Sequence, residues 1–175
     1  MLSSGRWGGG FPPGGQELPA CGGAGGILDR LWDFPGFGPL TKIETSFGEF
    51  PAQTLRQRDS VRTRRGTLAQ IRWVDRVTLN EEFLHHHPEA QPIVIPANAL
   101  GRGLPRHDVM LSPGQKVIAD GSLALRREMT AAELLAAGKA IRKPETIVTY
   151  TFLLCAQPVH VRVEGLYAPL EPPSW

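Results

Sequence analysis

This 175-residue chain has few cysteines and aromatic residues, and its net charge is small. Its two cysteines, Cys21 and Cys155, are too few for a disulfide framework, so reduced thiols are the simpler expectation. A formal net charge of +2 gives no reason to expect nucleic acid or a membrane surface as a partner. No apolar run approaches the roughly 18 residues that are needed to cross a bilayer. We therefore expect a single domain without a membrane span, cytoplasmic by default.

Glycine and proline, by contrast, are abundant, with 20 and 16 residues that together make about a fifth of the chain. Glycine is concentrated in residues 1–26, where few apolar side chains could offset the entropy of ordering the backbone. The same stretch lacks the apolar h-region of a secretory signal. We predict a flexible segment over residues 1–34, one folded domain over 35–170 and a tail over 171–175.

Short alternating runs of apolar and polar residues, separated by turn residues, begin at about residue 41 and predict an all-β domain. One short helix interrupts them. Thr130 and Glu133 have the spacing of a capping box, and good helix formers follow up to Gly138. This helix, over 131–137, is a connection rather than a layer of the core. The predicted strands lie within 41–45, 59–63, 69–77, 93–95, 109–111, 116–119, 146–154 and 159–164.

Residues 92–113 form the most informative stretch. Their pattern predicts a strand, a turn with Gly101 and Gly103, and a second strand that ends at a Ser-Pro break. This order resembles the centre of the bacterial Hedgehog/intein (Hint) domains. The most specific part is 99–106 followed by Asp108. The resemblance extends over about residues 36 to 166 and implies a compact Hint-like fold of many short strands.

Further motifs of the family recur in the same order along the chain. The family opens with Cys-Phe-x-x-Gly-Thr-x-Ile-x-Thr, and Gly36 stands here in place of the cysteine, with Leu40 in place of the glycine. A Gly-Asp-x-Val-x-Thr-x-x-Gly element follows, without its first glycine. The residues that match these two elements are Phe37, Thr41, Ile43, Thr45, Asp59, Val61, Thr63 and Gly66.

The resemblance implies self-directed acyl transfer as the ancestral activity, as in autoprocessing and protein splicing. A cysteine thiolate attacks the carbonyl before it, and a histidine protonates the departing nitrogen. Gly36 has no nucleophile, and Gln115, three residues after Ser112, replaces the histidine with a group that cannot donate a proton at neutral pH. Phe152 and Pro158 replace two later histidines. Loss of nucleophile and base together removes about 10⁶ in rate in units of this kind.

We therefore expect a Hint domain without an intact catalytic site, a metal or a cofactor, kept as a structural or interaction module with an unidentified protein partner. Two alternatives stay open. One is an active self-cleaving domain that uses Cys21 or Ser46 as its nucleophile. The other is an unrelated β-rich binding protein.

Other conspicuous residues have simpler structural interpretations. The histidines at 85–87 are interpreted as a solvated surface loop rather than a metal site, because adjacent residues of a strand point to opposite faces. We expect a hydrogen bond from His107 to Asp108 or to backbone, and an exposed or edge position for His160. The side chains expected in the core are Trp73, Tyr150 and an unreactive Cys155.

Overall fold

The computed structural model describes residues 34–119 and 127–171. Apart from Phe34 and Glu171, the predicted N-terminal segment and C-terminal tail lie outside these ranges, and so does Cys21. The prediction of a domain made of many short strands is confirmed, and two short α-helices accompany the strands.

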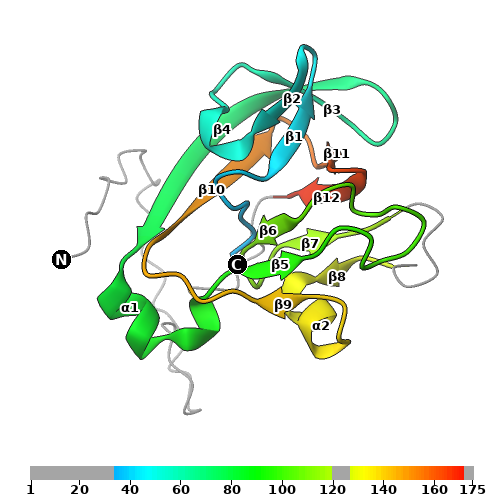
Figure 1. Ribbon diagram of the computed structural model, residues 1–175. Helices are drawn as coiled ribbons and strands as arrows, with labels where there is room; N and C mark the ends of the chain where they lie inside the picture. Colours follow the sequence, from blue (N-terminus) through cyan, green and yellow to red (C-terminus); the bar gives the residue numbers. More distant parts are fainter. Residues whose placement is uncertain (1–33, 120–126, 172–175) are drawn as a thin grey trace, which may run out of the picture.

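Seven antiparallel strands form the larger sheet, in the order β10-β4-β3-β1-β11-β12, with β2 also paired to β1. The longest two, β4 and β10, run side by side as a ribbon below the β1–β2 hairpin (Figure 1). The strands are β1 (Lys42–Thr45), β2 (Gly48–Pro51), β3 (Ser60–Arg62), β4 (Leu68–Leu79), β10 (Val148–Cys155), β11 (Val159–Val163) and β12 (Leu166–Leu170).

Two smaller sheets and the helices complete the fold. One sheet has the order β6-β5-β9, and the other pairs β7 with β8. These strands are β5 (Ile93–Ile95), β6 (Val109–Leu111), β7 (Lys116–Val117), β8 (Met129–Thr130) and β9 (Ile141–Arg142). The helices are α1 (Glu81–His86), α2 (Ala131–Ala136) and the 3-10 turns η2 (Ala52–Thr54) and η3 (Pro88–Ala90).

The alternation seen in the sequence decides which side chains enter the core. In β11, Val161 and Val163 are fully buried, whereas His160 and Arg162, which alternate with them, are half-exposed. The central strand β5 differs, because all three of its residues are buried between β6, β9 and α2. A continuous apolar run therefore marks a strand whose side chains are buried on both faces of its sheet.

The capping box predicted for α2 is confirmed. The amide of Glu133 donates to the Thr130 hydroxyl at 3.1 Å, and the Thr130 amide donates to the Glu133 carboxylate at 2.8 Å. These two bonds satisfy amides that the first helical turn leaves without partners. The helix ends at Ala136, one residue before the predicted boundary.

Helix α1 stands where a surface loop was expected. Asn80 caps it by accepting a hydrogen bond from the Phe83 amide at 3.0 Å, and its first turn carries Glu81 and Glu82. Only Leu84 in it is buried. Because six residues are too few to display a helical period, the sequence pattern did not reveal this helix.

Candidate functional site

Residues 34–38, here called the strap, cross the domain between β6 and β10. Phe37 of the strap exchanges both backbone hydrogen bonds with Thr151 of β10, each at 2.9 Å. On the other side, the Gly38 amide donates to the Met110 carbonyl of β6 at 2.8 Å. The strap is thus built into the fold as a short bridging segment.

Ser112, just after β6, holds the beginning of the strap with two bonds. Its amide donates to the Gly36 carbonyl at 3.0 Å, and its hydroxyl donates to the Phe34 carbonyl at 2.6 Å. The Ser112 side chain is buried. The Ser-Pro break of the sequence therefore fixes the backbone on both sides of Pro35, the residue whose carbonyl precedes position 36.

Gly36 lies against β10 at a distance that only glycine accommodates easily. A Cβ placed on this residue would lie 3.1 Å from the Tyr150 Cβ and 3.2 Å from Cε1 of the Phe152 ring. The neighbours would have to shift to admit even a methyl group. A side chain at position 36 would therefore begin in tight contact with β10.

A small apolar cluster fills the surroundings of Gly36. Phe152 meets Phe34 edge-on, with ring centroids 6.4 Å apart, and packs against the buried Tyr150 and residues of α1 and η3. The Tyr150 hydroxyl donates to the Ala90 carbonyl at 3.0 Å. Burial raises the pKa of the Tyr150 phenol well above its usual value, so this group keeps its proton at neutral pH.

Gln115 is joined to this region through Ser112, whose carbonyl accepts a bond from the Gln115 amide at 3.1 Å. Its side chain is only 1% exposed. The side-chain nitrogen donates to the Lys116 carbonyl at 2.9 Å, whereas Oε1 has no hydrogen-bond partner within the described part of the chain. A buried carboxamide in this position can orient and accept hydrogen bonds, but it has no proton to transfer.

The structure brings together only part of the predicted site. Gly36, Ser112 and Phe152 contact the strap or belong to it, and Gln115 is one hydrogen bond away. Pro158 instead lines a cleft beside the turn at residues 63–67.

The alternative nucleophile Ser46 lies just past β1, where its amide donates to the Ser60 carbonyl at 3.0 Å. The backbone at Ser46 therefore belongs to the β1–β3 side of the larger sheet, whereas Gly36 lies between β6 and β10. The other alternative, Cys21, lies outside the described residues.

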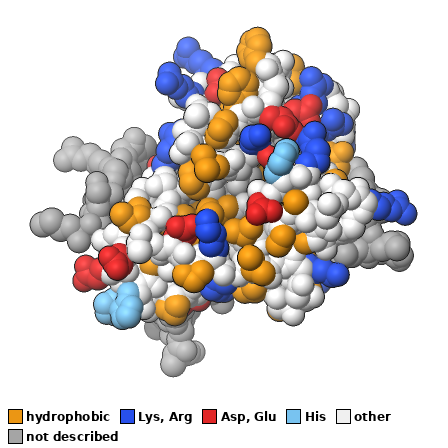
Figure 2. Space-filling model, viewed as in Figure 1, with side chains coloured by type: hydrophobic (Ala, Val, Ile, Leu, Met, Phe, Trp, Pro, Cys, Tyr) orange, Lys and Arg blue, Asp and Glu red, His pale blue; other side chains and the backbone are white. Residues whose placement is uncertain are grey.

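The histidines serve structural contacts in different parts of the fold. His85 and His86 are exposed in the last turn of α1, where the pale-blue side chains gather in Figure 2. His107 was expected to bond Asp108 or backbone, but its Nδ1 lies 2.8 Å from the buried Glu164 carboxylate. His160 lies 2.6 Å from the Glu128 carboxylate. Neither glutamate could be paired with its histidine from sequence spacing.

Two further expectations concern Trp73 and Cys155. Trp73 was expected in the core, but it lies on β4 opposite Leu154 of β10 and is 39% exposed. Cys155 is half-buried, and burial raises the pKa of its thiol to about 11. At neutral pH the thiol stays protonated and is a weak nucleophile.

Within the ranges that the structure describes, no group of three or more histidine, cysteine, aspartate or glutamate side chains is arranged to hold a metal ion. In the same ranges, no helix has the length and apolar character that a membrane crossing requires.

Comparison with known proteins places this geometry in context. The family model for the Hint domain matches residues 35–169. The crystal structure of the MchDnaB-1 intein is similar with a TM-score of 0.50 at 10% identity, covering 77% of this chain and 99% of that chain. For a DnaB intein from Synechocystis sp. PCC 6803, the TM-score is 0.51 at 7% identity, covering 79% and 100%. At these identities the likeness is one of fold alone. No curated protein sequence matches the chain.

Proposed function

Because this chain belongs to the Hint domain family, we propose that it is a self-processing domain that has lost its chemistry and is kept as a structural or interaction module. Family membership excludes the unrelated β-rich binding protein that the sequence had left open. Bacterial origin stays a prediction of the motif resemblance.

The observation that carries the proposal is the tight packing of Tyr150 and Phe152 against Gly36, which itself has no side chain. In the ancestral reaction, a cysteine sulfur at this position would attack the carbonyl carbon of Pro35. A C–S bond would form, the C–N bond to position 36 would break, and the nitrogen would take up a proton. Gly36 supplies no sulfur, and a Cβ at this position would lie only 3.1 Å from the Tyr150 Cβ and 3.2 Å from the Phe152 ring.

The second half of the reaction lacks its proton donor. Gln115 occupies the position that the motif assigns to histidine, and its carboxamide does not ionise near neutral pH. The charged and titratable groups named above pair elsewhere: His107 with Glu164, and His160 with Glu128. The bonds from Ser112 and Thr151 to the strap support a role in which it is held rather than cut.

The intact mass of the purified chain tests this proposal. We expect a single species of 19.1 kDa that persists after prolonged incubation with an added thiol. Release of an N-terminal fragment of about 3–4 kDa would instead support the active alternative, with Cys21 or Ser46 as nucleophile. Substitution of each residue by alanine would then identify which one acts.

A restoration experiment tests whether the scaffold retains the geometry of the ancestral reaction. The triple variant Gly36→Cys, Gln115→His, Phe152→Ala returns a thiol and an imidazole and removes the ring that occupies the space. We expect thiol-induced cleavage before position 36 in this variant. The matched control carries Gly36→Ala with the same other two changes, so it has the same packing without sulfur. Equal cleavage, or none, in two folded variants would contradict the proposal that the processing site lay here.

A further inference from the structure

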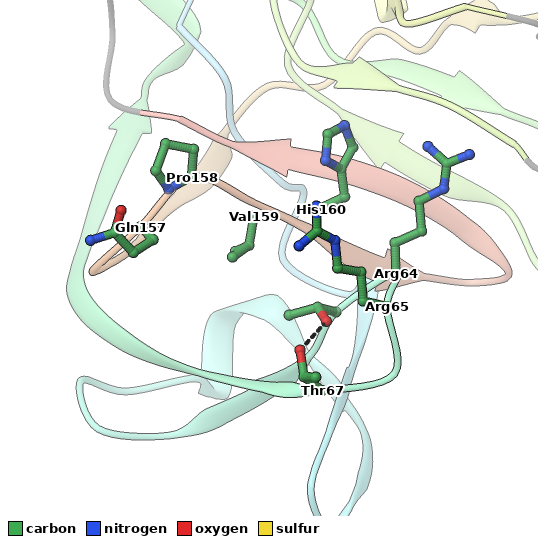
Figure 3. Close-up of a pocket in the computed structure, with 8 residues that line it drawn as sticks. Arg64, Arg65, Thr67, Gln157, Pro158, Val159 and His160 are labelled. Carbon is green, nitrogen blue, oxygen red and sulfur yellow. Dashed lines mark hydrogen bonds between the residues drawn. The ribbon is translucent and has the colours of Figure 1, made fainter.

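A cleft of about 710 Å³ lies between the turn at residues 63–67 and the segment that leads into β11. It is separate from the residues around Gly36, and its volume falls within the range of small-molecule sites. Figure 3 shows the two walls facing each other. The lining residues are Thr63, Arg64, Arg65, Thr67, Gln157, Pro158, Val159 and His160.

Backbone bonds hold the two walls in place. The Arg64 amide donates to the His160 carbonyl at 2.8 Å, and Thr63 forms a β-bridge with Val161. Within the turn, the Thr63 amide donates to the Thr67 carbonyl at 2.8 Å. The cleft is therefore formed before any ligand arrives, which reduces the entropy lost on binding.

The cleft is positively charged, and Arg65 is the charge directed into it. Figure 3 shows the Arg65 guanidinium reaching toward Val159 and His160, whereas Arg64 extends away. The Arg64 guanidinium lies 5.4 Å from the centre of the Tyr167 ring. No acidic residue lines the cleft, and Arg65 makes no ion pair within the described part of the chain. Its charge is consequently free to meet an anion.

The carboxylate of Glu128, which lies beside His160 of this wall, is already engaged. Glu128 accepts a bond from His160 at 2.6 Å. Glu128 bonds the His160 imidazole, so this imidazole is not counted among the groups that bind an anion. The positive charge of the cleft thus depends on the arginines.

Neutral donors and an apolar wall complete the surface. The Thr63 and Thr67 hydroxyls lie 2.8 Å apart, so one donates to the other and the second keeps a proton for a ligand. Pro158 and Val159 present apolar atoms on the opposite wall. A guanidinium beside a hydroxyl suits an oxyanion, because both donate to its oxygens.

We propose that this cleft binds a small organic anion, in which a carboxylate or phosphate group meets Arg65 and Thr63–Thr67 while an apolar part lies against Pro158 and Val159. The proposal goes beyond the function proposed above, since it holds whether or not the domain cleaves itself.

Amide chemical-shift titration of the full chain tests this assignment with three probes: benzoate, phenyl phosphate and the uncharged benzamide. We expect the two anions to shift amides at 63–67 and 157–160 in a saturable way, more weakly at higher salt. Benzamide should bind far more weakly. Tighter binding of phenyl phosphate than of benzoate would identify phosphate as the ligand group, and the reverse order would identify carboxylate.

Arg65→Gln isolates the charge, and Arg102→Gln is its matched control, an exposed arginine in another turn with no part in the cleft. Because Arg65→Gln removes the charge that would bond the anion, it should weaken anion binding about tenfold or more. Arg102→Gln should leave it unchanged. Equal affinities in both variants, equal binding of benzamide, or no saturation up to about 10 mM would overturn the proposal.

Discussion

At the scale of single residues, the side chain of Gln115 combines two properties that seldom occur together. It is 1% exposed, yet its Oε1 has no partner among the described residues. A buried acceptor without a hydrogen bond costs about 1–3 kcal/mol, whereas a typical bond such as that to the Lys116 carbonyl contributes about 0.5–1.5 kcal/mol. The side chain of Gln115 should therefore lower the free energy of unfolding rather than raise it.

The variant Gln115→Met removes the unpaired oxygen and keeps a similar volume. We expect the free energy of unfolding to stay equal or to rise by up to about 2 kcal/mol, as measured by urea denaturation. Gln53→Met, at an exposed position in η2, is the matched control and should change little. A loss of stability in Gln115→Met well beyond that of the control would mean that Oε1 is satisfied in solution, by water for instance.

Cys155 allows a prediction about pH. Burial raises the pKa of its thiol from 9.0 to about 11, because the thiolate is poorly solvated in the folded state. Between these values the unfolded chain releases a proton that the folded chain keeps. The contribution of Cys155 to stability is therefore undiminished below about pH 9 and falls as pH rises toward 11.

Alkylation rates of the Cys21→Ser variant, which keeps Cys155 as its one cysteine, measure this shift. The folded protein should react slowly at neutral pH and accelerate only as pH approaches 11, whereas the urea-unfolded chain should accelerate near pH 9. A folded thiol that reacts as fast as the unfolded one at neutral pH would contradict the raised pKa.

At the scale of elements, the strap depends on close approach to both neighbouring strands. A Cβ on Gly38 would lie 2.6 Å from Cγ and 2.7 Å from Cβ of Met110. The backbone of Gly38 is also bonded to Met110, so the strap cannot move away without losing that bond. Glycine is required here for space, not for an unusual backbone conformation.

Gly38→Ala should accordingly lower the free energy of unfolding by about 1–3 kcal/mol, as expected for overpacking. Met110→Ala removes Cγ and Sδ but leaves Cβ, so the double variant should recover part of the loss. Denaturation of the four proteins of this cycle measures the coupling. If the losses in the free energy of unfolding of the two single variants simply add in the double variant, residues 38 and 110 are not in steric conflict.

Elements were predictable where their signal is local. In β1, β3 and β11, apolar and polar residues alternate clearly, and the capping box of Thr130 and Glu133 marks the start of α2. Helix α1 was missed, because its cap and one buried leucine give too short a pattern. The prediction that Trp73 is buried was wrong, because the exposure of a strand residue depends on which other elements pack over it, and the strand pattern does not show that.

At the scale of the whole molecule, the family motifs predicted the overall fold, because their order along the chain is tied to one topology. Contacts between distant segments could not be predicted. Glu164 bonds His107 across 57 residues, and the cleft joins residues 63–67 to 157–160. No local pattern encodes such pairs, so Pro158 was placed with Gly36 in the predicted site although the structure gives it another setting.

The strap also has a mechanical consequence. A force pulling on the chain at Phe34 would reach the interior at once, through bonds to Ser112 and then to Thr151 and Met110 on opposite sides. The load would be shared between β6 and β10, and no edge strand would be peeled from a sheet. A domain of this kind could act as an anchor that resists tension at its own first residues.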